Sequence, residues 1–391
     1  MDLNGLKVTV VGAGIGGLTA ALVLRARGAK VTVLEQANAI TEVGAGLQVS
    51  PNGMAVLRSL GLETELRQKA VRGQAVELRD YARGRLVSRL QLTTLGEAAP
   101  YYFVHRADLI DVLANAARNA GIKILLLQKV EDVVPGDRPK VVLARGQEMK
   151  ADLVVGADGL HSVLRKTLNG TVAPFFTRQV AWRATVPNTM GHGPVAKVHM
   201  GPHRHVVSYP LRGGSLVNIV AVQERSGWHE EGWHIPDDPE NLQRCFSDFQ
   251  GETKTLLGAV DSVRKWGLFR HPVAPVWQRD NTALLGDAAH PTLPFMAQGA
   301  VMAMEDAWVL GDALAKAEDI NVGLAQYQAR RQDRVKKVVE TASKNAWRYH
   351  LSAPPLRFAA HLGLTMASTL APKAMMGAFD WIYRYDVTKD S

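Results

Sequence analysis

The N-terminal residues carry glycines and an acid at a spacing suited to hold a dinucleotide. Gly12, Gly14 and Gly17 form a GxGxxG pattern directly after the apolar run 7–11. In such a turn the first glycine permits the tight bend, the second lets a pyrophosphate approach the backbone, and the third lets the following helix pack on the strand. The pyrophosphate then lies at a helix N-terminus, where free N–H groups favour negative charge. Glu35 ends the next apolar run, at the separation expected for the acid that binds an adenosine ribose. The pattern predicts a dinucleotide site, but it does not separate FAD from NAD.

Two further pairs of glycine and aspartate follow apolar runs later in the chain. They are Asp158–Gly159, after 152–155, and Gly286–Asp287, after 282–285. An isolated Asp–Gly is usually only a turn. The second pair leads through Pro294 and Gln298 into a helix predicted to begin near Ala300. Whether these two pairs are functional or only turns therefore depends on the other motifs in the chain.

Composition limits what chemistry the chain can do by itself. With 391 residues, 47% hydrophobic and 21% charged, it is typical of a soluble globular protein with ample material for a core. The net charge of +9 comes from Lys and Arg scattered along the chain, so no nucleic-acid partner is predicted. The single cysteine, Cys245, excludes an internal disulfide, a CxxC pair and a thiolate metal cluster. Redox chemistry must therefore come from a bound cofactor.

No targeting signal or membrane span is expected. The chain lacks a basic leader and any stretch of about 18 uninterrupted apolar residues. We therefore expect a cytoplasmic protein, either a monomer or a homodimer. The apolar segment 356–381 is interrupted by Pro372, Lys373 and His361, so helices that pack on the core are expected there.

Periodicity predicts an α/β fold with an inserted sheet. The runs 7–11, 18–27 and 30–34 predict a parallel strand, helix, strand unit. The stretches 76–92 and 179–222 alternate at period two and predict antiparallel strands, whereas helices are expected at 106–119, 300–316 and 322–344. The predicted organisation is a discontinuous nucleotide-binding domain, 1–75, 100–178 and 266–391, and a mainly antiparallel β-sheet substrate domain, 76–99 and 179–265.

In this order, the GxGxxG, the Asp158 pair and the Asp287 pair resemble the three signature motifs of the class A flavoprotein monooxygenases. This family includes para-hydroxybenzoate hydroxylase and salicylate hydroxylase, and the resemblance covers nearly the whole chain. It implies a Rossmann-like FAD-binding domain of the glutathione-reductase type, bound FAD, and NADH or NADPH that binds transiently. The sequence contains no second GxGxxG, which argues against flavoenzymes with a separate nicotinamide-binding domain.

The resemblance also implies cofactor contacts for Arg106, Asp158, Asp287, Gly46, Gln48, Gly299 and Ala300. In the family, the aspartate matched by Asp158 lies near the FAD pyrophosphate and is linked to nicotinamide use. The residues matched by Asp287 and Arg106 contact the ribityl chain and phosphate region. Gly46 and Gln48 belong to the segment 44–48, which resembles the family segment along the flavin ring. Backbone N–H groups near Gly299 and Ala300, at a helix start, would stabilise negative charge on the reduced ring.

On the substrate side, the chain resembles salicylate hydroxylase, 3-hydroxybenzoate 6-hydroxylase and 6-hydroxynicotinate 3-monooxygenase most. The similarity lies in 205–211, in His290–Pro291 with Pro294 and Gln298, and in 381–386. It departs from the 6-hydroxynicotinate enzymes at Gln48, where they carry histidine, which makes a pyridine substrate less favoured. Pro294 and Gln298 are expected to contact the substrate.

His205 and Tyr209 are the candidate catalytic side chains. They stand four apart on a predicted strand and so share a face. Such a pair would orient a phenol and help to remove its proton, because a phenolate is electron-rich at its ortho and para carbons. Simple packing between the two domains is the alternative for both. Arg183 is the expected partner of a substrate carboxylate, while a surface position is expected for Arg83. The cluster His199, His203 and His205 predicts no metal site, because the turn at 201–202 explains its proximity and no nearby carboxylate pattern or thiolate accompanies it.

The resemblance implies that NAD(P)H reduces FAD and that a flavin C4a-hydroperoxide transfers hydroxyl to the aromatic acid, with O2 as oxidant. Two other functions remain open at this point. A reductase or dehydrogenase of the same fold would bind FAD without substrate-stimulated O2 uptake. A non-catalytic FAD-binding redox protein would oxidise NADH slowly with every aromatic acid. Fold-level analogy alone does not decide among them.

Overall fold

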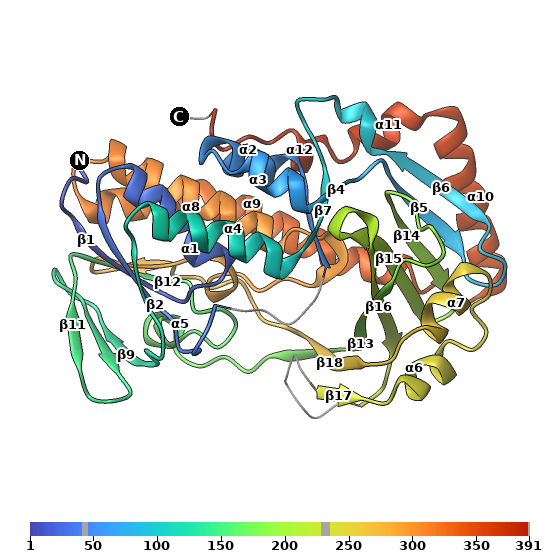
Figure 1. Ribbon diagram of the computed structural model, residues 1–391, viewed down its shortest axis with the longest axis horizontal. Helices are drawn as coiled ribbons and strands as arrows, with labels where there is room; N and C mark the ends of the chain where they lie inside the picture. The colour runs from blue at the N-terminus through green and yellow to red at the C-terminus, as the bar shows by residue number, and fades with distance from the viewer. Residues whose placement is uncertain (41–45, 228–234, 390–391) are drawn as a thin grey trace.

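The computed structural model describes residues 1–40, 46–227 and 235–389, apart from the side chains of 345–348. The molecule is elongated, with a nucleotide-binding lobe at one end and a sheet lobe at the other (Figure 1). The positions 44 and 45 of the predicted flavin segment lie outside the described residues.

The nucleotide-binding lobe is built on a sheet of six strands in the described part of the chain. Their order is β19 (Gln278–Arg279), β20 (Thr282–Leu284), β12 (Leu153–Gly156), β1 (Lys7–Val11), β2 (Lys30–Leu34) and β8 (Lys123–Leu125). All neighbours pair in parallel except β19 and β20. The predicted parallel unit is therefore confirmed. Its strands are almost entirely apolar because both faces of a parallel sheet are covered.

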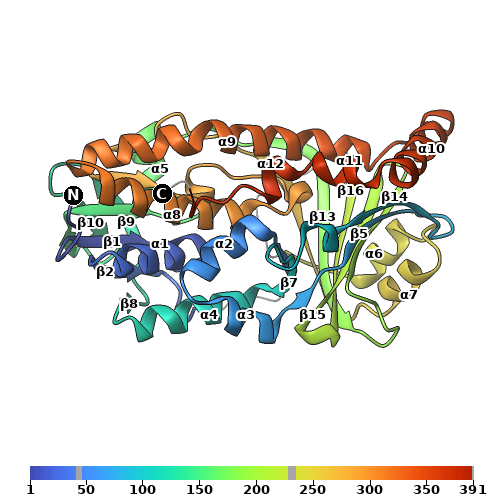
Figure 2. The same ribbon diagram turned by 90° about the horizontal axis from the view of Figure 1, so that it is seen from above.

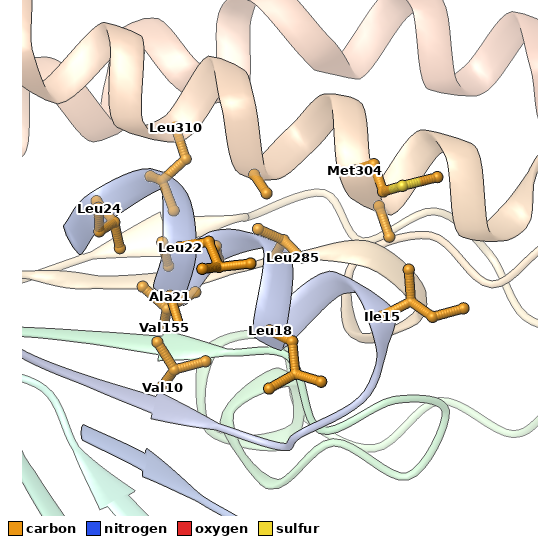
Figure 3. Packing of buried hydrophobic residues seen from close by; sticks show 14 of the residues in the cluster. Val10, Ile15, Leu18, Ala21, Leu22, Leu24, Val155, Leu285, Met304 and Leu310 are labelled. Atoms are coloured by element: carbon orange, nitrogen blue, oxygen red, sulfur yellow. The ribbon is translucent and has the colours of Figure 1, made fainter. Parts of the chain in front are cut away.

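Helices cover one face of this sheet. Figure 3 shows α1 (Ile15–Ala26) between the sheet residues Val10 and Val155 and the α8 residues Met304 and Leu310. α8 (Gly299–Lys316) and α4 (Arg106–Asn119) lie beside α1. Helix α1 begins three residues before the predicted 18–27, because Gly16 and Gly17 belong to its first turn. There the lack of a side chain lets the helix approach the strand closely.

The sheet lobe contains, within the described ranges, a sheet of eight strands. Their order is β17 (Ile235–Asp237), β18 (Val263–Arg270), β13 (Phe175–Pro187), β16 (Leu216–Glu224), β15 (Arg204–Leu211), β14 (Val195–Gly201), β5 (Ala75–Asp80) and β6 (Leu86–Gln91). Only β5 and β14 pair in parallel, so the sheet is mainly antiparallel as predicted. The strands span 75–91 and 175–270, close to the predicted limits of the substrate domain.

Smaller elements complete the two lobes. Two three-stranded sheets are formed by β3 (Gly46–Val49), β7 (Tyr102–His105) and β4 (Val71–Arg72), and by β11 (Glu148–Lys150), β10 (Lys140–Leu143) and β9 (Val130–Val134). The short helices are α2 (Pro51–Ser59), α3 (Glu63–Lys69), α5 (Val163–Asn169), α6 (Pro239–Cys245) and α7 (Glu252–Gly258), with 3-10 turns η1 (Leu92–Leu95), η2 (Arg212–Gly214), η3 (Gly286–Ala288) and η4 (Pro294–Met296).

The C-terminal helices connect the lobes. α9 (Ile320–Arg348) runs along the length of the molecule to the sheet lobe, where α10 (Pro354–Leu370), α11 (Pro372–Gly377) and α12 (Asp380–Tyr383) follow (Figure 2). The helices predicted for 356–381 are confirmed, but α10 is not a core helix. It covers β6 with one face only, and Phe358 and Leu370 remain 67% and 76% exposed. No helix among the described residues has the length and apolar character needed to cross a membrane.

Candidate functional site

Two adjoining cavities lie between the glycine turn, the 3-10 turn η3 and the sheet lobe. The larger, about 960 Å³, extends to Glu35 at the end of β2, and the smaller, about 380 Å³, reaches β14, β15 and β16. Both are lined by Gly14, Arg106, Ala157, Gly159, Arg183 and Asp287. The larger cavity opens at the carboxyl ends of β1, β2 and β12, where ligands of open parallel sheets bind.

The structure brings the predicted cofactor residues together around these cavities. Gly12, Glu35 and Asp158 line the larger one, and Gly46, Gln48, Gly299 and Ala300 line the smaller. Gly17 lines neither cavity, because it packs against the glycine turn itself. The residues come from both halves of the nucleotide-binding lobe, so a single elongated ligand would contact all of them.

Each of the three glycines of the turn is required for a different steric reason. Gly12 has φ +99°, and a Cβ there would lie 2.5 Å from the carbonyl oxygen of Ala157. A Cβ on Gly17 would lie 2.0 Å from the carbonyl oxygen of Gly12. Gly14 has no protein atom within 4 Å of its Cβ position, although it lines both cavities. Gly12 and Gly17 therefore serve the fold, while the bare backbone of Gly14 leaves room for a pyrophosphate.

Glu35 fixes the glycine turn to the end of β2. Its carboxylate accepts hydrogen bonds from the N–H groups of Ala13 and Ala37, both at 2.9 Å. Each carboxylate oxygen keeps a further acceptor position. Glu35 can thus hold the turn and still accept a bond from a ribose hydroxyl.

Two aspartates bring negative charge to the cavities. Asp158 accepts a hydrogen bond from Val163 N–H at 2.8 Å through one oxygen, while its other oxygen is buried without a partner in the described chain. Burial raises the pKa of Asp158. Asp287 is exposed and lines both cavities, yet desolvation by the surrounding protein raises its pKa, although the charges of His290 and Arg106 oppose this. Carboxylates in this position suit the hydroxyls of a polyol chain, which can donate to them.

Two arginines provide the positive charge. Arg183, on β13, places its guanidinium carbon 4.8 Å from the centre of the Trp266 ring. Its Nε has no hydrogen-bond partner among the described residues, and burial lowers its pKa to about 10. It therefore stays charged at neutral pH. Arg106, at the start of α4, lines the same cavities, and burial lowers its pKa while Asp287 raises it.

Arg165 was not predicted as a site residue, yet it braces the site. Its Nη1 donates to the carbonyl oxygens of Ala288 and Ala289, both at 3.1 Å. These bonds tie α5, which follows Asp158, to the turn that carries Asp287. A basic residue in the first turn of the helix after Asp158–Gly159 was the available sequence signal.

The start of α8 forms one wall of the smaller cavity. Pro294, Gln298, Gly299 and Ala300 all line it. The amide of Gln298, however, donates to Ser50 Oγ at 2.9 Å and accepts from Asn52 Nδ2 at 3.1 Å. These bonds position the start of α8, while the expected substrate contact of Gln298 stays a prediction. Asn52 lies 246 residues away in sequence, which hides this pairing from sequence patterns.

The far half of the smaller cavity is apolar with a few polar groups. Alternate residues of β14, β15 and β16 form its wall: Ala196, Val198, His205, Val207, Tyr209, Val220 and Val222. His205 and Tyr209 share this face, as their spacing predicted. Burial lowers the pKa of His205 well below its ordinary value, and burial raises the pKa of Tyr209. Both are therefore neutral at neutral pH. Arg83 is exposed in the turn after β5.

Several aromatic residues of this half were not assigned from sequence. Tyr101 donates its hydroxyl hydrogen bond to Gln48 Oε1 at 2.7 Å and packs edge-on against Tyr383, 5.8 Å away. Phe295, Tyr349 and Phe379 also line the cavity. Tyr383 belongs to the C-terminal segment 381–386 that carried part of the resemblance. The described residues include no group of three His, Cys, Asp or Glu placed to hold a metal ion.

Comparison with known proteins fits this arrangement. Residues 5–342 match a family model described as an FAD binding domain. The chain is 33% identical to 3-amino-4-hydroxybenzoate 2-monooxygenase of Streptomyces platensis, over 97% of this chain and 96% of that protein. This chain belongs to the FAD-dependent aromatic monooxygenases. It is also 34% identical to 3-hydroxybenzoate 6-hydroxylase of Klebsiella oxytoca, covering 88% of this chain and 89% of the relative.

A solved structure supports the cofactor. Klebsiella pneumoniae HpxO complexed with FAD and uric acid matches with a TM-score of 0.83 and 26% identity, over 96% of this chain and 97% of that one. The monooxygenase family, the Rossmann-like FAD fold with its added sheet, and FAD with a transient nicotinamide reductant are thus confirmed. The residues also fit such a ligand physically, because the bare backbone at Gly14, the unpartnered oxygen of Asp158 and the Arg106–Asp287 pair suit its phosphate and polyol groups.

Proposed function

We propose that this chain hydroxylates a small aromatic acid that carries a ring hydroxyl, using NAD(P)H and O2. The observation that carries the proposal is the smaller cavity, which joins the FAD-binding residues to an apolar chamber containing His205 and Tyr209. FAD, when bound, takes electrons from NAD(P)H and activates O2. The protein residues have three tasks: to orient the ring, to prepare its hydroxyl, and to exclude water.

His205 and Tyr209 are proposed to prepare the substrate hydroxyl. Because His205 is neutral, one of its ring nitrogens can accept a proton. Tyr209 keeps its proton and can donate a hydrogen bond to the phenolate oxygen that forms. Loss of the phenol proton raises electron density at the ortho and para carbons, which makes them reactive toward electrophilic oxygen.

Arg183 is proposed to attract the substrate carboxylate. It is charged, lies between the two cavities, and its Nε lacks a hydrogen-bond acceptor in the described residues. A buried cation without an acceptor is costly, and a carboxylate would supply that acceptor with a charge-assisted bond. Pro294, at the start of η4, is proposed to contact the ring.

The aromatic wall is proposed to keep water away from the reaction. Phe295, Tyr349 and Phe379 surround the chamber with apolar surface, and the valines of the sheet close its other side. A dry site strengthens the electrostatic interactions inside and prevents wasteful loss of activated oxygen as hydrogen peroxide.

The relatives suggest where to look for the substrate. Those named above act on hydroxybenzoates, one with an amino group, and their names fit a ring with both hydroxyl and carboxyl groups. We also propose that the domains divide at 75/76, 99/100, 178/179 and 265/266. The protein is further proposed to be cytoplasmic, near the nicotinamide pool, and to be a monomer or a homodimer.

The test is a substrate panel on the purified FAD-loaded protein. NADH and NADPH oxidation, O2 uptake and peroxide yield are measured with hydroxybenzoates, amino-hydroxybenzoates and hydroxynicotinates. The proposal predicts that at least one hydroxybenzoate speeds NAD(P)H oxidation with little peroxide. Basal rates with every compound would contradict it and favour a reductase or a non-catalytic redox protein.

A further inference from the structure

A line of hydrogen bonds leads from the substrate chamber to the surface of the sheet lobe. His205 Nδ1 lies 2.6 Å from His350 Nε2, and His350 Nδ1 lies 2.9 Å from Glu224 Oε1. The other oxygen of Glu224 lies 2.6 Å from His203 Nδ1. Every neighbouring pair is thus within hydrogen-bond distance.

The two inner histidines of this line are buried, and the two outer side chains are partly exposed. His205 lines the chamber and is 1% exposed, and the side chain of His350 is 1% exposed. The side chains of Glu224 and His203 are 38% and 58% exposed. The line therefore joins an enclosed chamber to water through groups that can each accept and release a proton.

The carboxylate at the outer end sets the proton positions in both inner rings. Hydrogen bonds from His203 and His350 lower the pKa of Glu224 although burial opposes this, so Glu224 is an acceptor. His350 must then carry its proton on Nδ1, which leaves Nε2 to accept from His205 Nδ1–H. The neutral ring of His205 consequently has its lone pair on Nε2, the nitrogen that His350 does not engage.

The backbone holds this arrangement in place. His203 N–H donates to the carbonyl oxygen of His350 at 3.2 Å, and Glu224 N–H donates to the carbonyl oxygen of His203 at 2.9 Å. The His205 ring also packs against Phe295 and Tyr349, with centroids 5.7 Å and 5.3 Å away. These backbone bonds and the packing of the His205 ring favour proton transfer without side-chain movement.

We propose that His205, His350 and Glu224 form a proton relay between the substrate hydroxyl and solvent, with His203 bonded to the outer oxygen of Glu224, an inference that rests on the proposed function. The substrate O–H bond breaks and its proton binds His205 Nε2. His205 Nδ1 releases its proton to His350 Nε2, and His350 Nδ1 releases its proton to Glu224, which is 38% exposed and passes it to water while His203 Nδ1–H stays bonded to the other carboxylate oxygen. One proton enters and one leaves, and the reverse sequence returns a proton to the product oxygen.

The relay explains how a histidine with a strongly lowered pKa can act as a base. Alone, a buried imidazole that resists a positive charge would remove a phenol proton poorly. Because the relay passes the charge to Glu224, no full positive charge has to remain on His205. His350, Glu224 and His203 therefore act through His205 and are positioning and relay residues.

The test uses the FAD-loaded protein and the chromogenic phenol 4-hydroxy-3-nitrobenzoate, whose phenolate absorbs visible light. Stopped-flow difference spectra below the phenol pKa follow ionisation of the bound probe. We expect Glu224→Gln and His350→Gln to slow ionisation about tenfold or more, with FAD content and equilibrium probe affinity within about twofold of wild type. His203→Gln should have a smaller effect, because His203 only holds the outer oxygen of Glu224 and Glu224 itself reaches water.

A matched control is available on the opposite face of the sheet, where α7 packs. Glu252 Oε1 lies 3.8 Å from His192 Nε2, and neither residue lines the cavities. Glu252→Gln should leave the ionisation rate unchanged. Ionisation at the wild-type rate in both relay variants would overturn the relay. If wild type binds the probe without ionising it, the relay fails while aromatic-acid binding stands; if wild type does not bind it, the proposed substrate class fails and the relay with it.

A second measurement does not depend on the substrate. In the ligand-free FAD-loaded protein with ¹⁵N-histidine, nitrogen shifts report which ring nitrogen carries the proton. The relay predicts the Nδ1–H tautomer for both His205 and His350, with His205 shifting toward the other tautomer in His350→Gln. The Nε2–H tautomer of His205 in wild type would contradict it.

Discussion

Gly46 and Tyr209 touch across the boundary between the two lobes. A Cβ on Gly46 would lie 2.5 Å from Tyr209 Cε2 and 2.8 Å from its hydroxyl oxygen. The N–H of Gly46 also donates to Asn218 Oδ1 at 2.7 Å, which fixes β3 against β16. The segment along the expected flavin ring is thus in direct contact with a candidate catalytic side chain.

This contact predicts the effect of Gly46→Ala. The added methyl group must push Tyr209 or β3 aside, and such overpacking costs about 1–3 kcal/mol. We expect a lower melting temperature and a larger share of O2 released as peroxide. Gly363→Ala, where no atom lies within 4 Å of the Cβ position, is the control and should leave both unchanged or raise stability slightly. Equal behaviour of the two variants would contradict the contact.

Gly14 and Gly17 should respond differently to the same substitution. Gly14→Ala meets no protein atom, so the FAD-free protein should melt near the wild-type temperature while FAD affinity falls about tenfold or more. Gly17→Ala forces a Cβ onto the Gly12 carbonyl oxygen and should destabilise the FAD-free fold by about 1–3 kcal/mol. Melting curves without FAD and fluorescence titration with FAD distinguish the two. Full FAD affinity in Gly14→Ala would show that the pyrophosphate does not lie there.

Arg183→Met tests the carboxylate partner. Removal of a charge-assisted hydrogen bond should weaken binding of a hydroxybenzoate by about 10- to 100-fold. The corresponding neutral amide, a hydroxybenzamide, should lose little affinity, because it carries no charge for Arg183 to neutralise. Parallel titrations of both ligands against wild type and variant measure the coupling. Equal losses for the two ligands would mean that Arg183 only shapes the chamber.

Buried histidines should make stability depend on pH. Burial lowers the pKa of His199 from 6.5 to about 4, and burial also lowers the pKa values of His192, His205 and His350. Between pH 6.5 and 4 the unfolded chain therefore binds more protons than the folded chain. The free energy of unfolding has its full value above this window and falls as the pH drops through it. Each such histidine contributes up to about 1.4 kcal/mol per pH unit. Urea unfolding at several pH values gives the free energy of unfolding as a function of pH. In His199→Gln this free energy should fall less steeply as the pH drops from 6.5 to 4, and an unchanged pH dependence would contradict the lowered pKa.

The sequence predicted those parts of the site that depend on local conformation. The turn at Gly12, the acid at Glu35 and the turns at Asp158 and Asp287 each follow a strand directly, and parallel strands bring their carboxyl ends to one edge. Strand alternation predicted that His205 and Tyr209 share a face, and the resemblance of 205–211 singled them out. The order of the motifs then indicated the family.

Pairings between distant segments could not be predicted in the same way. His350 reaches His205 across 145 residues, and Gln298 reaches Ser50 across 248. No local sequence pattern identifies these contacts, because a buried amide or imidazole meets its partner only after the chain has folded. Helices that pack on the core were predicted for 356–381, but composition could not show that α10 meets β6 with one face and leaves the other exposed.

The most direct test of the account is to follow the oxygen atom. The FAD-loaded protein is supplied with NAD(P)H, the best hydroxybenzoate of the panel and ¹⁸O2, and the product is examined by mass spectrometry. The account predicts an aromatic product heavier by one ¹⁸O atom, formed in proportion to the NAD(P)H consumed. An unlabelled ring, with all consumed O2 recovered as labelled peroxide, would contradict hydroxylation at this site.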